Sequence, residues 1–312
     1  LLPVVNSLRS KGHEVVYDEC DESFDVIFGA HWSPGADFSS VCLSFTENPS
    51  VPFVTYSWDC YKWYTDHLKE QDSLAYTYFN PPKEPVPLSD DKADRILTKE
   101  GIEWYRHKWV LQNSKRIVCP SMSVVFTTRE GFKAIPRHNY RIVHPFKRHL
   151  DIKLEQIRDD RFIYMPLRVK SNEDLHKDWF LQAMRDLEIP EENNYISAKS
   201  LSEEEYADKI ASCSFLVCPL HEASTGGLSL LEGYHVGKPV LISNSPYVGA
   251  RDYFGWSAHY FDDNSYEDFK AAIWDLWINT PVLDIKECRK LTSKYTADKM
   301  ADGLLKVFEE VI

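Results

Sequence analysis

Short apolar runs recur along the chain, and each is bounded by turn or charged residues. Such runs are typical of buried parallel strands, because both faces of the sheet are covered. They fall into two groups, one in each half of the chain. The first comprises His13–Tyr17, Asp25–Gly29, Pro52–Tyr56, Arg116–Cys119 and Tyr140–His144; the second comprises Phe162–Met165, Tyr195–Ser197, Phe215–Cys218, Val240–Ser243 and His259–Phe261, the last as an edge strand.

Apolar positions at helical spacing lie between these strands. They predict helices over Lys177–Leu187, Tyr266–Ile278 and Ala297–Ile312, and a helix that begins at Ser202 with acidic residues in its first turn. A long helix over Ala93–Gln112 is expected after a Pro-rich loop. The alternation of strands and helices predicts an α/β protein with two Rossmann-like units.

The chain opens unusually for this class. Leu1–Ser10 has the pattern of the end of a helix, which Lys11 and Gly12 close. Because an α/β domain normally begins with a strand, we expect a first strand to precede the numbered sequence.

Composition narrows the range of functions. A length of 312 residues suits two domains of about 150 residues each. The net charge of −12 argues against extensive nucleic-acid binding. The seven Cys residues form no CxxC pair, which favours reduced, buried thiols in a cytoplasmic protein. No apolar run is long enough to cross a bilayer, and no signal peptide is expected.

The segment Phe215–Ser243 carries the clearest chemical signal. It predicts a strand, a polar loop, an amphipathic helix and a second strand. Small residues end the loop, so a ligand can approach their N–H groups at the positive end of the helix dipole, where phosphate binds. These residues are Ser224, Thr225, Gly226 and Gly227. Glu232 follows within the helix, where its carboxylate can accept hydrogen bonds from sugar hydroxyls.

This segment resembles the donor-site signature of the GT-B fold glycosyltransferases, in particular the retaining family 4 (glycosyl transferases group 1). The matching residues are Pro219, Gly227, Leu228, Glu232, Gly237, Pro239 and Val240. The E-x7-E motif is divergent, because Ser224 occupies the position of the first Glu and Glu222 lies two residues earlier.

The resemblance implies two Rossmann-like domains whose parallel sheets face each other across a cleft. Residues 1–147 would form the acceptor domain and residues 148–294 the donor domain, with the last helix, at about 295–312, packing back on the first domain.

The resemblance also implies roles for single residues. Arg168 and Lys177 would hold the donor diphosphate and stabilise the charge that grows on it, so that no metal or other cofactor is needed. Glu232 would bind the ribose, and Ser224 to Leu228 would line the donor. Glu222 and His31 would contact the sugar or the cleft. The alternatives are surface cations for Arg168 and Lys177, a solvated loop acid for Glu222, and a buried structural histidine for His31.

The implied partners are a nucleotide-sugar donor and an acceptor hydroxyl on a glycan, a lipid-linked sugar, a protein, a small metabolite or a modified nucleobase. Two departures, Ser224 and the absence of a His after the strand Pro52–Tyr56, motivate a non-catalytic nucleotide-sugar-binding subunit as the alternative. A sugar-nucleotide epimerase is the third hypothesis. Aromatic and basic residues over Trp58–Trp63 and Trp104–Trp109 leave peripheral membrane contact open.

Overall fold

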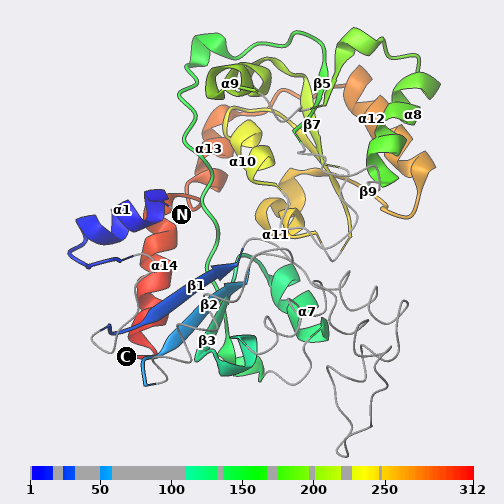
Figure 1. The fold of residues 1–312 in the computed structure, drawn as a ribbon. Helices are drawn as coiled ribbons and strands as arrows, with labels where there is room; N and C mark the ends of the chain where they lie inside the picture. The colour runs from blue at the N-terminus through cyan, green and yellow to red at the C-terminus, as the bar shows by residue number, and fades with distance from the viewer. Residues whose placement is uncertain are drawn as a thin grey trace, which may run out of the picture. The chain divides into compact units, whose positions relative to one another are not determined.

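The computed structural model describes residues 2–16, 24–31, 50–57, 110–131, 136–166, 175–196, 201–218, 227–245 and 248–312. The chain divides into two compact units (Figure 1). One comprises Leu1–Val143 with Ala301–Ile312, and the other comprises His144–Met300. Each unit holds one sheet in which every strand pair is parallel, which confirms the predicted α/β class with two parallel sheets.

The sheet of the first unit has the strand order β1-β2-β3-β4. Its strands are β1 (Ile27–His31), β2 (Phe53–Ser57), β3 (Arg116–Cys119) and β4 (Tyr140–Ile142), accompanied by the helices α1 (Leu2–Ser10) and α7 (Met122–Gly131) and the 3-10 turn η1 (Arg137–Asn139). All five residues of β2 are buried, as expected of an apolar strand in the interior of a parallel sheet.

The end of the chain packs on this first sheet. The last helix, α14 (Ala297–Glu309), brings Phe308 against Phe28 of β1, with their ring centroids 5.5 Å apart. Glu310 accepts hydrogen bonds from Arg116 of β3 and Arg141 of β4. These bonds lower the pKa of the Glu310 carboxyl to about 2, so it stays charged at neutral pH.

The predicted strand at His13–Tyr17 is wrong over the residues that the structure describes. Residues 13–16 form neither helix nor strand, and Val16 is exposed. The apolar pair at Val15 and Val16 is too short to bury a face, and the Val15 carbonyl accepts a hydrogen bond from the Arg9 side chain instead of from a neighbouring strand.

The sheet of the second unit has the order β6-β5-β7-β8-β9, which confirms the predicted edge position of β9. Its strands are β5 (Ile163–Met165), β6 (Asn194–Ile196), β7 (Phe215–Cys218), β8 (Val240–Ser243) and β9 (His259–Phe261). The helices are α8 (Leu175–Asp186), α9 (Glu203–Ser212), α10 (Leu228–His235), α11 (Ala250–Phe254), α12 (Tyr266–Ile278) and α13 (Ile285–Thr292), with the 3-10 turns η2 (Leu154–Gln156), η3 (Glu191–Asn193) and η4 (Gly255–Ser257).

Alternation along the strands divides the core of this unit into two layers. In β7, Leu216 faces a cluster that includes α9, α10, α11 and α13, whereas Val217 faces the cluster that includes α8 and α12. Figure 1 shows the same separation of helices on the two faces of the sheet. Each central strand is therefore buried on both sides, which explains its continuous apolar run.

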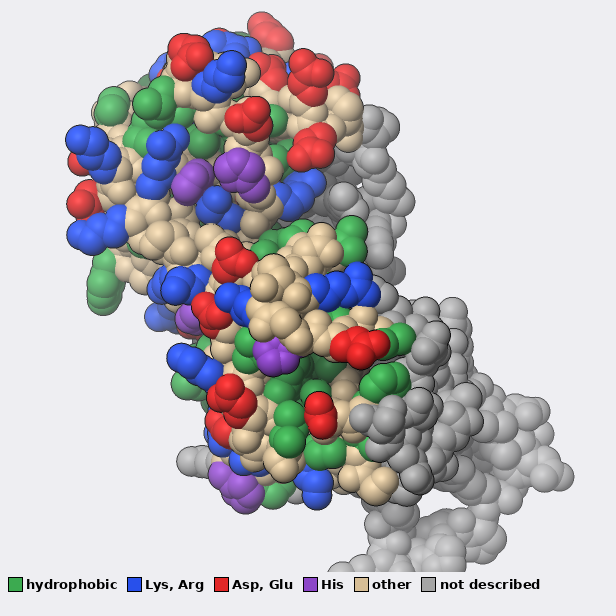
Figure 2. All heavy atoms as spheres, turned by 90° about the vertical axis from the view of Figure 1, so that its left-hand side faces the viewer, with side chains coloured by type: hydrophobic (Ala, Val, Ile, Leu, Met, Phe, Trp, Pro, Cys, Tyr) green, Lys and Arg blue, Asp and Glu red, His purple; other side chains and the backbone are tan. Residues whose placement is uncertain are grey.

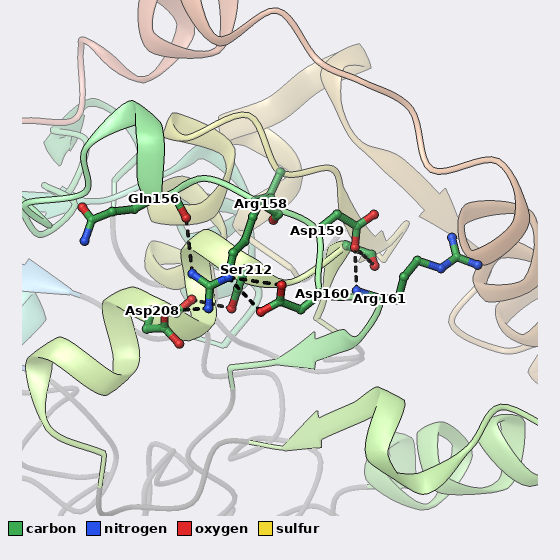
Figure 3. Close-up of polar contacts among 9 residues, drawn as sticks. Gln156, Arg158, Asp159, Asp160, Arg161, Asp208 and Ser212 are labelled. Carbon is green, nitrogen blue, oxygen red and sulfur yellow. Dashed lines mark hydrogen bonds and ion pairs between the residues drawn. The ribbon is translucent and has the colours of Figure 1, made fainter.

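A polar network fixes the segment that leads into β5 (Figure 3). The Arg158 guanidinium pairs with Asp160 and with Asp208 of α9, at N–O distances of 2.9 and 3.0 Å. The N–H groups of Arg158 and Asp160 donate to carbonyls at the end of α9. These contacts lie at the amino ends of the strands, so the network supports the fold at the edge opposite the carboxyl ends of the strands.

Four of the seven Cys residues lie in the described part of the chain. Cys119, Cys213, Cys218 and Cys288 are all buried thiols, as predicted for these positions. Burial raises the pKa of the Cys213 thiol to about 12, so this group is an unreactive part of the core. Within the same ranges, no helix combines the length and the apolar character needed to cross a membrane.

Candidate functional site

The connections around β5 and β7 create a topological switch point in the second sheet. After β5 the chain continues into α8 on one face, and after the neighbouring β7 it continues into α10 on the other face. In open parallel sheets a ligand binds beyond the carboxyl ends of two such strands, because their connections separate there. The candidate site therefore lies where β5 and β7 end, at Met165 and Cys218.

Helix α10 begins at Leu228, ten positions after Cys218, the last residue of β7. Gly227 is its N-cap residue, with a φ of 122°, and it supplies no side-chain cap. The first intrahelical bond runs from the Leu231 N–H to the Gly227 carbonyl, at 2.8 Å. The N–H groups of the first three helical residues, from Leu228 on, thus lack an intrahelical acceptor. Together with the helix dipole they form a seat for an anion.

Glu232 lies one turn further along α10 and is buried. Its side chain is 1% exposed. One carboxylate oxygen accepts the backbone N–H of Arg148 at 3.1 Å and the Arg148 Nε at 3.0 Å. The other oxygen accepts the hydroxyl of Tyr206 in α9, and the Arg148 Nη2 at 3.4 Å. Both oxygens of this buried carboxylate are thus occupied by hydrogen bonds.

Arg148 and Tyr206 complete a compact charged group with Glu232. The guanidinium carbon of Arg148 lies 4.4 Å from the centre of the Tyr206 ring, a cation–π distance. Burial and the charge of Glu232 raise the pKa of Tyr206, so its hydroxyl stays protonated and donates. Burial opposes the charge on Arg148, but Glu232 outweighs it and the pKa of Arg148 is raised. The Arg148 side chain is 48% exposed, so one side of the group reaches solvent.

The predicted site residues fall into three sets. Gly227, Leu228 and Glu232 lie together at the start of α10, as the sequence suggested. Lys177 is the third residue of α8, and His31 is the last residue of β1 in the first unit; the side chains of both lie outside the described part of the structure. Outside the described residues altogether are Arg168, Glu222, Ser224, Thr225 and Gly226.

Ser57 ends β2 in the first unit. Its backbone pairs with that of His31 across the sheet. The Ser57 hydroxyl is buried and has no hydrogen-bond partner among the described residues. A buried hydroxyl without a partner is costly, so this position can serve a ligand or a neighbouring loop.

Sequence reasoning missed Arg148 and Tyr206. They lie 84 and 26 residues before Glu232 in the chain, and no local motif links them to it. Within the described ranges, no group of three or more His, Cys, Asp and Glu side chains is placed to hold a metal ion.

Comparison with solved structures shows the fold. Sucrose-phosphate synthase from Thermosynechococcus elongatus has a TM-score of 0.53 and 12% identity, covering 88% of this chain and 77% of its own. A glycosyltransferase from Rickettsia africae has a TM-score of 0.56 and 12% identity, with coverages of 100% and 81%. Anabaena HepE, solved in complex with UDP and glucose, has a TM-score of 0.62 and 8% identity, with coverages of 98% and 81%.

Searches by sequence added no relative, since neither the scan against family models nor the search of curated proteins gave a match. At 8–12% identity, the likeness to the solved structures establishes a shared fold.

Proposed function

We propose that this chain is a nucleotide-sugar-dependent glycosyltransferase of the GT-B fold, with its donor site at the carboxyl ends of β5 and β7. The switch point between these strands, in a fold shared with a glycosyltransferase and with a protein that holds UDP and glucose, is the observation that carries the proposal. The reaction moves a sugar to an acceptor hydroxyl with retention and without a metal.

The start of α10 would hold the donor phosphate. Its first N–H groups, which have no acceptor within the helix, and the absence of a side chain at Gly227 support this role, because they let a phosphate oxygen approach the helix closely. Ser224, Thr225 and Gly226 precede Gly227 and would extend the contact. Glu222 or Ser224 would take the place of the first Glu of the E-x7-E motif toward the sugar.

Arg168 and Lys177 would neutralise the diphosphate as it leaves. Arg168 follows Met165, the last residue of β5, by three positions, so the chain itself keeps their Cα atoms within about 11 Å of each other. Lys177 belongs to the first turn of α8, the helix that follows the same strand. Fixed cations of this kind stabilise the charge that develops in the transition state.

Glu232 would bind the ribose of the nucleotide. Hydrogen bonds from Arg148 already occupy its carboxylate oxygens, so ribose binding requires the Arg148 guanidinium to leave. Because this guanidinium is half-exposed, its release to water costs little free energy. We propose that ribose hydroxyls replace the Arg148 side-chain bonds, while Tyr206 continues to hold the carboxylate in place. His31, at the carboxyl end of β1, would serve the sugar or the acceptor from the first unit.

The first experiment measures thermal stability of the full chain with UDP, GDP, ADP, TDP and CMP, followed by release of the nucleotide from its sugar conjugates in the presence of acceptors. We expect one nucleotide to raise the melting temperature. We expect Arg168→Gln to lower turnover at least about tenfold, the usual scale for losing one charge-stabilising group. Arg185→Gln, which removes an exposed Arg at the other end of α8, is the matched control and should keep wild-type turnover.

The outcomes separate the hypotheses. Nucleotide binding without any turnover would favour a non-catalytic partner subunit, and conversion of the donor sugar without an acceptor would favour an epimerase. If no nucleotide stabilises the chain, the donor-site proposal fails.

A further inference from the structure

A cluster of basic and imidazole side chains lies at the carboxyl end of α10, in the second unit. Its members are Lys147 and His149, which precede η2, His235, which ends α10, and Arg289 in α13. The Lys147 N–H donates to the Tyr295 carbonyl at 3.0 Å, which ties its segment to the residues after α13. In Figure 2, purple His side chains lie among blue Lys and Arg side chains on the face turned to the viewer.

Charges within the cluster act on His235 and on Lys147. Burial, followed by the charges of Lys147, Arg289 and His149, lowers the pKa of His235 to about 4. Burial also lowers the pKa of Lys147, with Arg289 lowering it further and Glu232 opposing both. Among the described residues whose charges act on Lys147 and His235, Glu232 is the one acid, and its oxygens are already engaged by Arg148 and Tyr206. The cluster therefore carries an excess of positive charge in a chain whose net charge is −12.

Donor groups in the cluster lack acceptors among the described residues. The Arg289 Nε is buried without a hydrogen-bond partner. The side chain of Lys147 enters none of the ion pairs or hydrogen bonds found between described residues. His235 donates its Nδ1–H to the Thr292 hydroxyl at 2.8 Å, and its Nε2 becomes a donor for an anion when the ring is protonated. A buried guanidinium N–H without an acceptor costs free energy, and an anion would satisfy it.

We propose that Lys147, His149, His235 and Arg289 form a binding site for a phosphoryl group, distinct from the phosphate seat at the start of α10. Arg supplies a planar fork of donors, and the Lys ammonium and a protonated imidazole add further N–H donors, a combination that suits a tetrahedral oxyanion. Helix α10 has 8 residues and is about 12 Å long, so the cluster at its end is remote from the phosphate seat at its start. Cations near the carboxyl end of a helix also interact favourably with the helix dipole. That interaction would leave the buried Nε of Arg289 without an acceptor, whereas a bound anion supplies one.

The test follows the ring signals of His235 by NMR in the full chain while inorganic phosphate is added. We expect a saturable shift and a rise in the pKa of His235, because the bound anion offsets the charges of Lys147 and Arg289. The double variant Lys147→Gln, Arg289→Gln should weaken phosphate binding at least about tenfold. The control Lys153→Gln, Lys286→Gln removes the same charge from exposed positions of the same unit and should bind phosphate like the wild type.

A second arm identifies the source of the phosphoryl group. Phosphatidylcholine vesicles with and without phosphatidic acid are mixed with both double variants. The protein binds a lipid headgroup at this site if the wild type is retained on the acidic vesicles and only the variant Lys147→Gln, Arg289→Gln loses that retention. The site takes a soluble phosphate or phosphate ester if the protein binds phosphate but not the vesicles. The proposal is overturned if the His235 ring signals shift linearly with phosphate, without saturation, and no vesicle retention depends on phosphatidic acid. It is also overturned if the two double variants have equal effects in both experiments.

Discussion

The variant Glu232→Ala is expected to lose about 2–3 kcal/mol of unfolding free energy and to lose nucleotide binding. The stability loss arises because the buried Tyr206 hydroxyl loses its acceptor and Arg148 loses its partner. This loss of unfolding free energy is small for a broken buried ion pair, because Arg148 is 48% exposed and water can solvate its guanidinium. Denaturant unfolding and calorimetric titration with the nucleotide measure the two losses separately.

Arg148→Met is the matched variant, because it breaks the same ion pair from the other side. If the carboxylate serves the ribose, Arg148→Met also costs stability but retains nucleotide affinity, since Glu232 and Tyr206 remain. If Glu232→Ala binds the nucleotide as well as the wild type does, the carboxylate serves the fold alone and the ribose assignment is wrong.

The variant Gly227→Ala is expected to lower the unfolding free energy by about 2–4 kcal/mol and to weaken nucleotide binding. A φ of 122° is strained for any L side chain, and the added Cβ would lie 2.9 Å from the Ala250 Cβ. Ala250 is the fully buried first residue of α11, so it cannot shift easily, and the start of α10 has to move. Denaturant unfolding gives the stability, and the same titration gives the affinity.

Gly255→Ala provides the control. Gly255 also has a positive φ, of 52°, but an added Cβ would meet nothing within 4 Å. Its expected cost is about 1 kcal/mol, from the left-handed backbone alone, with no change in nucleotide affinity. Equal losses in the two variants would show that the contact between Gly227 and Ala250 is of no consequence.

The strands of the second sheet could be predicted from the sequence because their signal is local. Phe215–Cys218, Val240–Ser243 and His259–Phe261 have the predicted bounds. Each is a short apolar run next to turn residues, and burial on both faces removes any competing pattern.

Helix α13 was not predicted, for the opposite reason. Its sequence, IKECRKLT, is largely polar, and it buries only Cys288 and Thr292. Tertiary packing against α10, where Ile285 lies close to Gly237, supplies the stability that the local pattern lacks.

The partners of Glu232 show the same limit at the site. The helix position of Glu232 follows from the sequence, but its ion pair with Arg148 joins segments 84 residues apart. Whether a helical carboxylate faces solvent or a guanidinium from a distant segment depends on how the segments pack, and spacing within one helix carries no information about that.

Hydrogen exchange with and without UDP tests the location of the donor site most directly. The account predicts that UDP slows exchange at the start of α10, from Leu228 on, and at the start of α8, the helices that follow β7 and β5. Exchange over residues 156–161, at the amino ends of the same strands, should stay unchanged. Protection confined to the amino ends, or absent from the start of α10 while UDP binds, would contradict a donor site at the switch point.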